Sequence, residues 1–155
     1  TLVDFHRMMT RLVEMEDSQY SYRNVLAAYT SGGILAGICV AYDGGKLHQL
    51  RRRFYEAALE AFGIDYTGMT DETEDGEFYI DSLAVSSNFR GKGIASQLLQ
   101  ATIERGAELG IPTVGLLVDK GNPKAEALYQ RLGFVYVNDS TWGGHPMRHL
   151  QYKHD

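Results

Sequence analysis

The sequence is poor in cysteine and has no long apolar run. Cys39 is the only cysteine among 155 residues, which excludes a disulfide framework and a multi-cysteine zinc site and is compatible with a reducing cytoplasm. No apolar run approaches the ~20 residues of a membrane-spanning helix. The first residues also lack the basic and apolar segments of a secretory signal. We therefore expect a cytoplasmic protein with no membrane partner.

Charge and composition set further bounds. Hydrophobic residues make up 44% of the chain and charged residues 23%, and the formal net charge is -5. A negative charge disfavours general binding to nucleic acid and mildly favours a cationic partner. The length fits one domain over residues 1–155, which needs no disulfide or metal to fold. Cys39 lies in the apolar stretch ILAGICVAY, so we expect it to be a buried structural thiol.

The first half of the chain predicts two helices and a hairpin. Apolar residues recur at three-to-four-residue spacing in segments 2–15 and 46–62, which is typical of amphipathic helices. Segments 24–30 and 34–43 are rich in apolar and β-branched residues and flank two glycines, which predicts a β-hairpin. We expect Gly63 to cap the second helix.

Two charged segments accompany these elements. The triplet Arg51–Arg53 lies within the second predicted helix, and we expect it on the solvated face of that helix. The segment TDETEDGE, residues 70–77, is strongly acidic and contains no apolar residue. It predicts an exposed and mobile loop, which could also line a site for a cation.

The second half alternates strands and helices. Strands at 78–85 and 113–119 enclose a helix at 93–109, which predicts a right-handed βαβ unit with a parallel strand pair. Asn122 and Pro123 then begin another helix. The closing elements are strands at 134–137 and 147–153, separated by a loop at 138–146 that contains Trp142.

The stretch NFRGKGIASQLL, residues 88–99, joins a predicted strand to a predicted helix. The unpaired N–H groups at the start of a helix attract anions, and a phosphate or pyrophosphate is the natural occupant. Gly91 and Gly93 let such an anion approach the backbone, although the two glycines could also merely form a turn. The stretch lacks the Walker spacing, and Ser96 stands where a dinucleotide-binding motif has its third glycine.

RGKGIA resembles the R/Q-x-x-G-x-G/A signature of the GNAT superfamily of N-acetyltransferases, through Arg90, Gly93 and Ala95. NPKAEALYQRLGF is similar to the superfamily's later N-x-x-A-x-x-L-Y-x-x-x-G-F pattern. With DSLAV before the loop, the resemblance covers Asp81 to Phe134. It implies an α/β (α+β) fold, with a mixed, mostly antiparallel twisted sheet, a central parallel βαβ unit and flanking helices.

The resemblance implies transfer of an acetyl group from acetyl-CoA to a primary amine of a small molecule or protein, with no metal. Strand backbone would pair with the pantetheine arm, loop amides would hold the pyrophosphate, and Tyr129 would stand near the thioester sulfur as proton donor. Helix capping by Asn122 and core packing by Tyr129 are the alternatives. The implied cofactor-binding residues are Leu83, Ala84, Val85, Arg90, Gly91, Lys92, Gly93, Ile94, Ala95, Ser96, Asn122 and Tyr129.

The acceptor amine must lose a proton before it attacks, and two carboxylates are candidates for taking it. Asp81 and Glu77 are four positions apart on one predicted strand, hence on one face, and either would act directly or through water. The alternatives are a structural hydrogen bond for Asp81 and solvation at a strand edge for Glu77. His145 and His149 also share one strand face, where an exposed polar surface is the favoured interpretation.

Other interpretations stay open at this stage. GNAT proteins begin with a strand before their first helices, so this strand is either upstream of Thr1 or absent. A polyamine, an aminoglycoside and a protein amino terminus are all compatible with the sequence as acceptor. A non-catalytic acyl-CoA sensor, which Tyr129 disfavours, and a nucleotide-binding regulatory domain are alternative functions. A homodimer is an expectation only because dimers are common in the superfamily.

Overall fold

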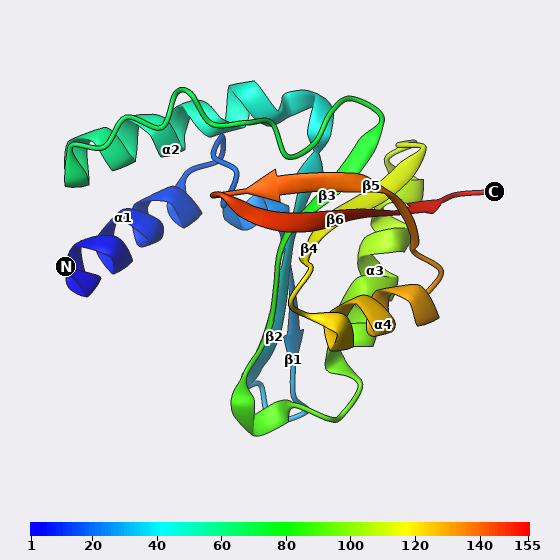
Figure 1. Cartoon of the computed structure of the whole chain (residues 1–155). Coiled ribbons are helices and arrows are strands. Elements are labelled where there is room, and N and C mark those ends of the chain that lie inside the picture. The colour runs from blue at the N-terminus through cyan, green and yellow to red at the C-terminus, as the bar shows by residue number, and fades with distance from the viewer.

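The computed structural model describes residues 1–155 as a mixed six-stranded sheet with helices on both faces (Figure 1). The helices are α1 (Leu2–Glu14), α2 (Leu47–Phe62), α3 (Ile94–Glu108) and α4 (Pro123–Arg131). The strands are β1 (Val25–Tyr29), β2 (Leu35–Asp43), β3 (Glu77–Val85), β4 (Thr113–Asp119), β5 (Val135–Trp142) and β6 (His145–Lys153). Short 3-10 turns are η1 (Tyr22–Asn24), η2 (Gly44–Lys46) and η3 (Ser87–Phe89). The predicted fold class is confirmed.

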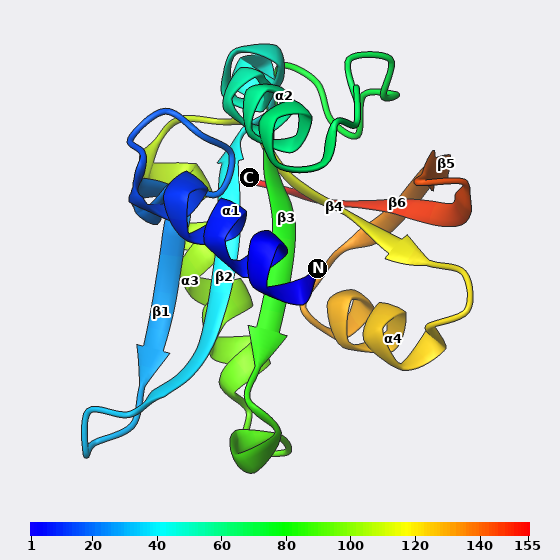
Figure 2. The ribbon, with the colours of Figure 1, turned by 90° about the vertical axis from the view of Figure 1, so that its left-hand side faces the viewer.

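The strand order is β1-β2-β3-β4-β6-β5, and only the β3–β4 pair is parallel. That pair runs from Glu77↔Thr113 to Ile80↔Leu116 and then stops. Beyond it, β3 pairs only with β2, whereas β4 continues beside β6. We call this place, past Ile80 and Leu116, the strand divergence. Figure 2 shows β3 and β4 separating there, with α1 on the near side of the sheet and α3 behind it.

Three apolar clusters fix the layers. The largest lies between the sheet and α3, where fully buried Leu99, Val114 and Leu150 pack together, and α4 adds Leu128 and Tyr129 at its margin. On the opposite face, Leu47 and Leu50 of α2 pack on Tyr42 and Tyr79. Helix α1 packs mainly on α2, through Met8 and Leu12. The layers leave the strand divergence bordered by α3 and α4 on one side and by α2 on the other.

Local signals explain most helix ends. Thr1 and Asp4 form a capping box at the start of α1, and Gly63 adopts the left-handed conformation that ends α2. Cys39 is buried as expected. No strand precedes α1 within residues 1–155. None of the helices is both long enough and apolar enough to cross a membrane.

The predicted loop at 138–146 is wrong. Most of this segment belongs to β5, whose last residue is Trp142, and the connection to β6 is only Gly143 and Gly144. Both glycines have positive φ, as a two-residue hairpin turn requires. The first half of β5 was predicted, and its second half, residues 138–142, was missed because these polar residues lie on an exposed edge strand and show no apolar alternation.

Candidate active site

The backbone of the loop between β3 and α3 has the geometry that an anion would need. Gly91 and Gly93 have φ of +77° and +79°, and nothing lies within 4 Å of where a Cβ would stand on either. Gly93 is the N-cap of α3 and offers no side chain, so the first N–H groups of the helix stay unpaired. A pocket of about 230 Å³ lies here, lined also by Leu128 and Arg131 of α4.

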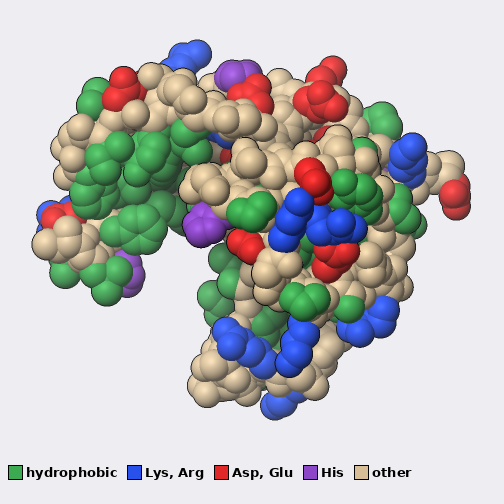
Figure 3. All heavy atoms as spheres, viewed as in Figure 1, with side chains coloured by type: hydrophobic (Ala, Val, Ile, Leu, Met, Phe, Trp, Pro, Cys, Tyr) green, Lys and Arg blue, Asp and Glu red, His purple; other side chains and the backbone are tan.

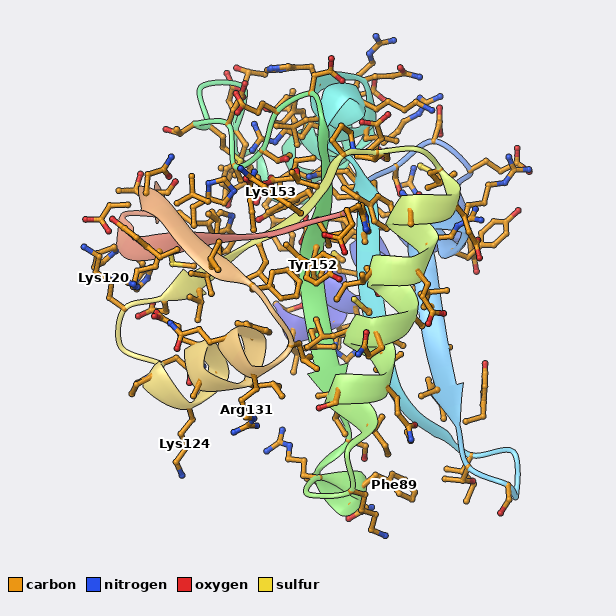
Figure 4. The ribbon with its side chains drawn as sticks, turned by 90° about the vertical axis from the view of Figure 1, so that its right-hand side faces the viewer. Phe89, Lys120, Lys124, Arg131, Tyr152 and Lys153 are labelled. Atoms are coloured by element: carbon orange, nitrogen blue, oxygen red, sulfur yellow. The ribbon has the colours of Figure 1, made fainter.

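Cationic side chains surround this pocket. Arg90 Nε donates to the carbonyl oxygen of Val85 at 3.3 Å, and Lys92 Nζ lies 5.6 Å from the centre of the Phe89 ring. Arg131 projects from the end of α4 towards the same loop (Figure 4). Free helix N–H groups, the helix dipole and these cations all favour a phosphate group. The geometry therefore fits a pyrophosphate.

The strand divergence leaves one edge of β3 free beside that loop. Leu83, Ala84 and Val85 pair with Cys39, Ile38 and Gly37 of β2, and β4 offers them no partner. Backbone groups on this edge are available to an extended ligand, as in the addition of a strand to a sheet. The residues expected to contact a pantetheine arm thus lie directly before the residues expected to hold its pyrophosphate.

Asn122 and Tyr129 lie on α4, across the divergence from β3. Asn122 Oδ1 accepts a hydrogen bond from the Ala125 N–H at 3.2 Å, so its helix-capping role is confirmed. Tyr129 packs edge-on against Phe134, with ring centroids 6.1 Å apart. Burial raises the pKa of the Tyr129 hydroxyl, which keeps the group protonated and able to donate. A contact of either residue with a ligand remains a prediction.

Asp81 occupies a β-bulge in β3. Val40 pairs with Ser82 and Ala41 pairs with Ile80, which leaves Asp81 as the extra residue. The bulge lets Ile80 and Leu83 both reach the core on the α3 side, although they are three positions apart. Asp81 consequently faces the α2 side, where its Oδ2 accepts a hydrogen bond from the Tyr42 hydroxyl at 2.9 Å. The bulge stands at the divergence itself.

The surroundings of Asp81 adjust its acidity. Burial raises the pKa of Asp81 to about 6, and the charge of Glu72 adds to this rise. Hydrogen bonds from Tyr42 and Ser82 oppose it by stabilising the carboxylate. A carboxyl group with this pKa is mostly ionised at neutral pH and can still accept a proton.

Glu77 lies on the same face of β3 as Asp81, but both of its carboxylate oxygens already have hydrogen-bond partners. Its Oε1 accepts a hydrogen bond from Thr73 Oγ1 at 2.6 Å, and its Oε2 lies 2.6 Å from His149 Nε2 and 2.7 Å from Gln151 Nε2. To reach β6 the carboxylate crosses β4 over Gly115, where a Cβ would stand 1.8 Å from Oε2. Solvation of Glu77 at a strand edge is therefore excluded, because only 1% of the residue is exposed.

Arg51 and the acidic segment at 70–77 are less exposed than the sequence predicted. Arg51 is 1% exposed, not solvated, and forms ion pairs of 3.2 Å with both Asp71 and Glu72. Glu72 also accepts a hydrogen bond from the Tyr79 hydroxyl at 3.0 Å. A buried guanidinium needs such partners, so the acidic segment folds over α2 and Glu72 and Thr73 become buried. The prediction of a wholly exposed loop at 70–77 was wrong.

The same segment lines a second pocket, of about 270 Å³, on the α2 side of the divergence. Its walls include Asp71, Glu74, Leu117 of β4 and His149 of β6. The expectation of an exposed face is wrong for His149, whose side chain is 14% exposed and turned to Glu77, and correct for His145. Nowhere in the chain do three or more histidine, cysteine or acidic side chains converge as metal ligands do.

The surface where α1 and α2 meet is rich in apolar side chains. Figure 3 shows green side chains gathered where α1 and α2 meet, and a hollow in the surface beneath them. The exposed apolar residues of the two helices are Leu2, Val3, Phe5, Val13, Leu59 and Phe62. The α2 side therefore combines an acidic pocket with exposed apolar side chains on α1 and α2.

Sequence reasoning missed two polar clusters on the α2 side. One joins Gln19 to Tyr42 and Asp81, and the other joins Arg51 and Tyr79 to Glu72. These residues lie far apart in the chain, and no short motif contains them. One signal was present: Gly115 interrupts an otherwise apolar strand, and an isolated glycine in a strand often marks a close approach.

Comparisons with known proteins agree with this geometry. The family model described as acetyltransferase (GNAT) family matches residues 6–134. A solved structure described as an acetyltransferase superposes with a TM-score of 0.81 at 30% identity, covering 95% of this chain and 78% of the other. An N-acetyltransferase from Staphylococcus aureus Mu50 superposes with a TM-score of 0.77 at 22% identity, covering 92% and 78%, which supports the fold alone.

Curated relatives match in shorter stretches. The uncharacterised N-acetyltransferase YdgE of Bacillus subtilis is 40% identical over 62 residues, which are 40% of this chain and 40% of that protein. The spermine/spermidine N(1)-acetyltransferase of Bacillus subtilis is 27% identical over 94 residues, 59% of this chain and 62% of that one. The chain thus spans less than two thirds of the length of these relatives.

Proposed function

We propose that this chain, which belongs to the acetyltransferase (GNAT) family, transfers an acetyl group from acetyl-CoA to an amine. The observation that carries the proposal is that a free strand edge at 83–85 is followed, after the short turn η3, by a loop at 90–96 with unpaired N–H groups. An extended thioester with a pyrophosphate at its far end needs both, in this order. A nucleoside triphosphate would need the loop but not the free edge.

The pyrophosphate would lie on the loop. Hydrogen bonds to charged oxygens contribute about 1.5–3 kcal/mol each. The amide groups of Gly91, Gly93, Ile94, Ala95 and Ser96, with Arg90 and Lys92 beside them, would supply several such bonds. Three or four of them total about 4.5–12 kcal/mol before the entropy lost on binding is subtracted, so the ~8 kcal/mol of a micromolar ligand also needs contacts along the rest of the molecule. The free edge at Leu83–Val85 and the side chain of Asn122 would orient the pantetheine arm.

Tyr129 would donate a hydrogen bond to the departing sulfur. A phenol of pKa ~10 is a weaker acid than a thiol of ~8.5, so full proton transfer is uphill by roughly 2 kcal/mol. Hydrogen-bond donation to the developing thiolate therefore contributes more than transfer does. Tyr129 is suited to this role because its hydroxyl stays protonated.

Asp81 would take the proton from the acceptor, directly or through water. Only about one part in 10³ of an ammonium of pKa ~10.4 is neutral at pH 7, so the attack needs a proton acceptor. Asp81 stands at the divergence, and its pKa of about 6 suits this role. Glu77 has both oxygens occupied and would act only through His149. The acidic pocket beside them supports a cationic acceptor.

A thermal-shift series with acetyl-CoA, CoA and ATP tests the first step, because a ligand that binds only the folded state raises its melting temperature. We expect stabilisation by acetyl-CoA and CoA and none by ATP. An amine panel that includes polyamines, aminoglycosides and peptides with free amino termini, with detection of released thiol, then tests transfer. Stabilisation by ATP alone would overturn the proposal, and CoA binding without turnover on any amine would favour an acyl-CoA sensor.

A further inference from the structure

Two consecutive buried hydrogen bonds link Gln19 to Tyr42 and Tyr42 to the Asp81 carboxylate. Gln19 Nε2 donates to the Tyr42 hydroxyl oxygen at 3.0 Å, and the Tyr42 hydroxyl donates to Asp81 Oδ2 at 2.9 Å. Gln19 and Tyr42 are each 2% exposed. The segment that carries Gln19 is itself fixed, because Asn24 Nδ2 donates to the carbonyl oxygens of Ser18 and Gln19, both at 3.1 Å.

The direction of these bonds is set by their donors. The Gln19 amide donates into the hydroxyl oxygen of Tyr42, so the single proton of that hydroxyl is left for Asp81. Burial, with the charge of Asp81 next in importance, raises the pKa of Tyr42, so the hydroxyl remains a donor across the working pH range. The arrangement has one consistent orientation from Gln19 to the carboxylate.

Other groups also act on Asp81 from the elements packed around it. Glu72, from the acidic segment, disfavours the charged carboxylate, whereas Arg51 of α2 favours it. Ser82, on β3 itself, donates to Oδ1 at 3.1 Å. Tyr42 is the donor that reaches Asp81 from the neighbouring strand β2. It therefore opposes the two influences, burial and Glu72, that would neutralise the carboxylate.

We propose that Tyr42 and Gln19 are positioning residues, which hold a hydrogen-bond donor on Asp81 Oδ2 and so keep the Asp81 carboxylate ionised. The proposal rests on the proposed function only in assigning the proton acceptor to Asp81. No atom of Tyr42 or Gln19 needs to touch a substrate for this role. Its signature is a change in the pH at which Asp81 titrates, not a loss of activity at every pH.

Tyr79 provides a matched control. It lies on the same side of the sheet, its ring is 5.8 Å from that of Tyr42 in an edge-on contact, and its residue is also buried. Its hydroxyl, however, donates to Glu72 and not to Asp81. Tyr42→Phe and Tyr79→Phe each remove one buried hydroxyl from the same aromatic pair, and only the first removes a donor from Asp81.

The experiment measures kcat/KM against pH for both variants, as a ratio to the parent enzyme. Loss of one hydrogen bond to a charged group moves a carboxyl pKa upward by about one pH unit. For Tyr42→Phe the ratio should then be about one fifth at pH 6 and return close to one at pH 8. Gln19→Leu should shift the profile in the same direction by less, and Tyr79→Phe should not shift it.

A second readout does not depend on activity. Carbon-13 NMR of the carboxyl groups, with the Asp81 signal assigned by its absence in Asp81→Asn, follows the titration of Asp81 directly. An upward move in Tyr42→Phe and none in Tyr79→Phe supports the proposal even if no acceptor is found. Equal titration of Asp81 in all three proteins, with melting temperatures confirming that they are folded, overturns it. A proportional loss of activity at every pH in Tyr42→Phe would mean a structural role only.

Discussion

The two sides of the strand divergence are built in different ways. On the α3–α4 side, the anion loop offers backbone N–H groups, and its residues from Arg90 to Ser96 are contiguous in the chain. On the α2 side, the site consists of side chains that meet from distant segments, such as Glu77 and His149. Backbone geometry is encoded in short motifs, whereas a polar side-chain network depends on the tertiary fold.

The two sides should therefore fail differently under mutation. A substitution in the loop is expected to abolish ligand binding while the fold survives, since the glycines there face open space and the strain of a side chain at their positive φ is only about 1–2 kcal/mol. A substitution that separates a buried charge on the α2 side from its partners is expected to lower stability, because an unpaired charge in the interior is costly. Each change below tests this difference, beginning with the largest expected effect.

Gly115→Ala should destabilise the protein by about 3–5 kcal/mol, because the new methyl group would push the buried Glu77 carboxylate away from its partners. The added Cβ would lie 1.8 Å from Glu77 Oε2. Gly68→Ala is the control, since that position has open space and no positive φ. Urea unfolding of both variants measures the effect. Equal stabilities would show that Glu77 moves aside at no cost.

Gly93→Glu should weaken CoA binding by about 10²–10³-fold, because a carboxylate would replace the anion at the start of α3 and forfeit several charge-assisted hydrogen bonds. The matched control is Gly33→Glu, at a glycine with nearly the same φ, +81° against +79°, and equally open surroundings in the β1–β2 turn. Calorimetric titration with CoA compares the two. Unchanged affinity in Gly93→Glu would place the ligand elsewhere.

Tyr129→Phe should lower kcat by about 10–100-fold with little change in the KM for acetyl-CoA, since a donor to the leaving sulfur acts in the transition state. The ring keeps its contact with Phe134, so stability should change little. Steady-state kinetics with the best acceptor from the amine panel measures both constants. Equal turnover in parent and variant would leave Tyr129 with a packing role.

Asp81→Asn should raise stability at neutral pH while it removes the proton acceptor. The folded-state pKa of Asp81 is about 6 against an ordinary 3.8, so its contribution to stability is fully present below about pH 4 and is lost as pH rises through 6. The loss at pH 8 is at most roughly 3 kcal/mol, and we expect about 1–2 kcal/mol because the asparagine amide bonds less well with Tyr42. Thermal unfolding of parent and variant at pH 4 and pH 8 tests this, and a constant difference between them would contradict it.

The contrast between short local motifs and side chains that meet from distant segments also explains how much the sequence could predict. The βαβ unit, the glycine turn that leads into α3 and the cap at Asn122 were predicted correctly because each depends on glycines, caps and apolar spacing within about 50 residues of chain. The burial of Arg51 was missed because its partners, Asp71 and Glu72, lie in a segment whose composition alone indicates solvent exposure. Local charge density says nothing of a counter-ion that tertiary folding brings near.

The two candidate bases show this limit in detail. Asp81 and Glu77 were placed on one strand face, and they do share it, although the bulge at Asp81 could not be read from the alternation of residues. The occupation of Glu77 by His149 joins residues 72 positions apart, so no motif could reveal it. The roles proposed for these residues stay predictions.

The parallel pair of β3 and β4, which ends at Ile80↔Leu116, is also the strand pairing that holds the two parts of the sheet together. It joins β1–β3 to the β4–β6–β5 unit, and Glu77 ties the two together by bonding to β6 across β4. If β3 and β4 move further apart at the divergence, the sheet must bend about this short parallel pair. Glu77 then lies near the axis of bending, and Leu83–Val85 move furthest. Amide hydrogens should accordingly exchange slowly at Tyr79 and Ile80 and faster towards Val85, and the gradient should flatten when a ligand fills the opening.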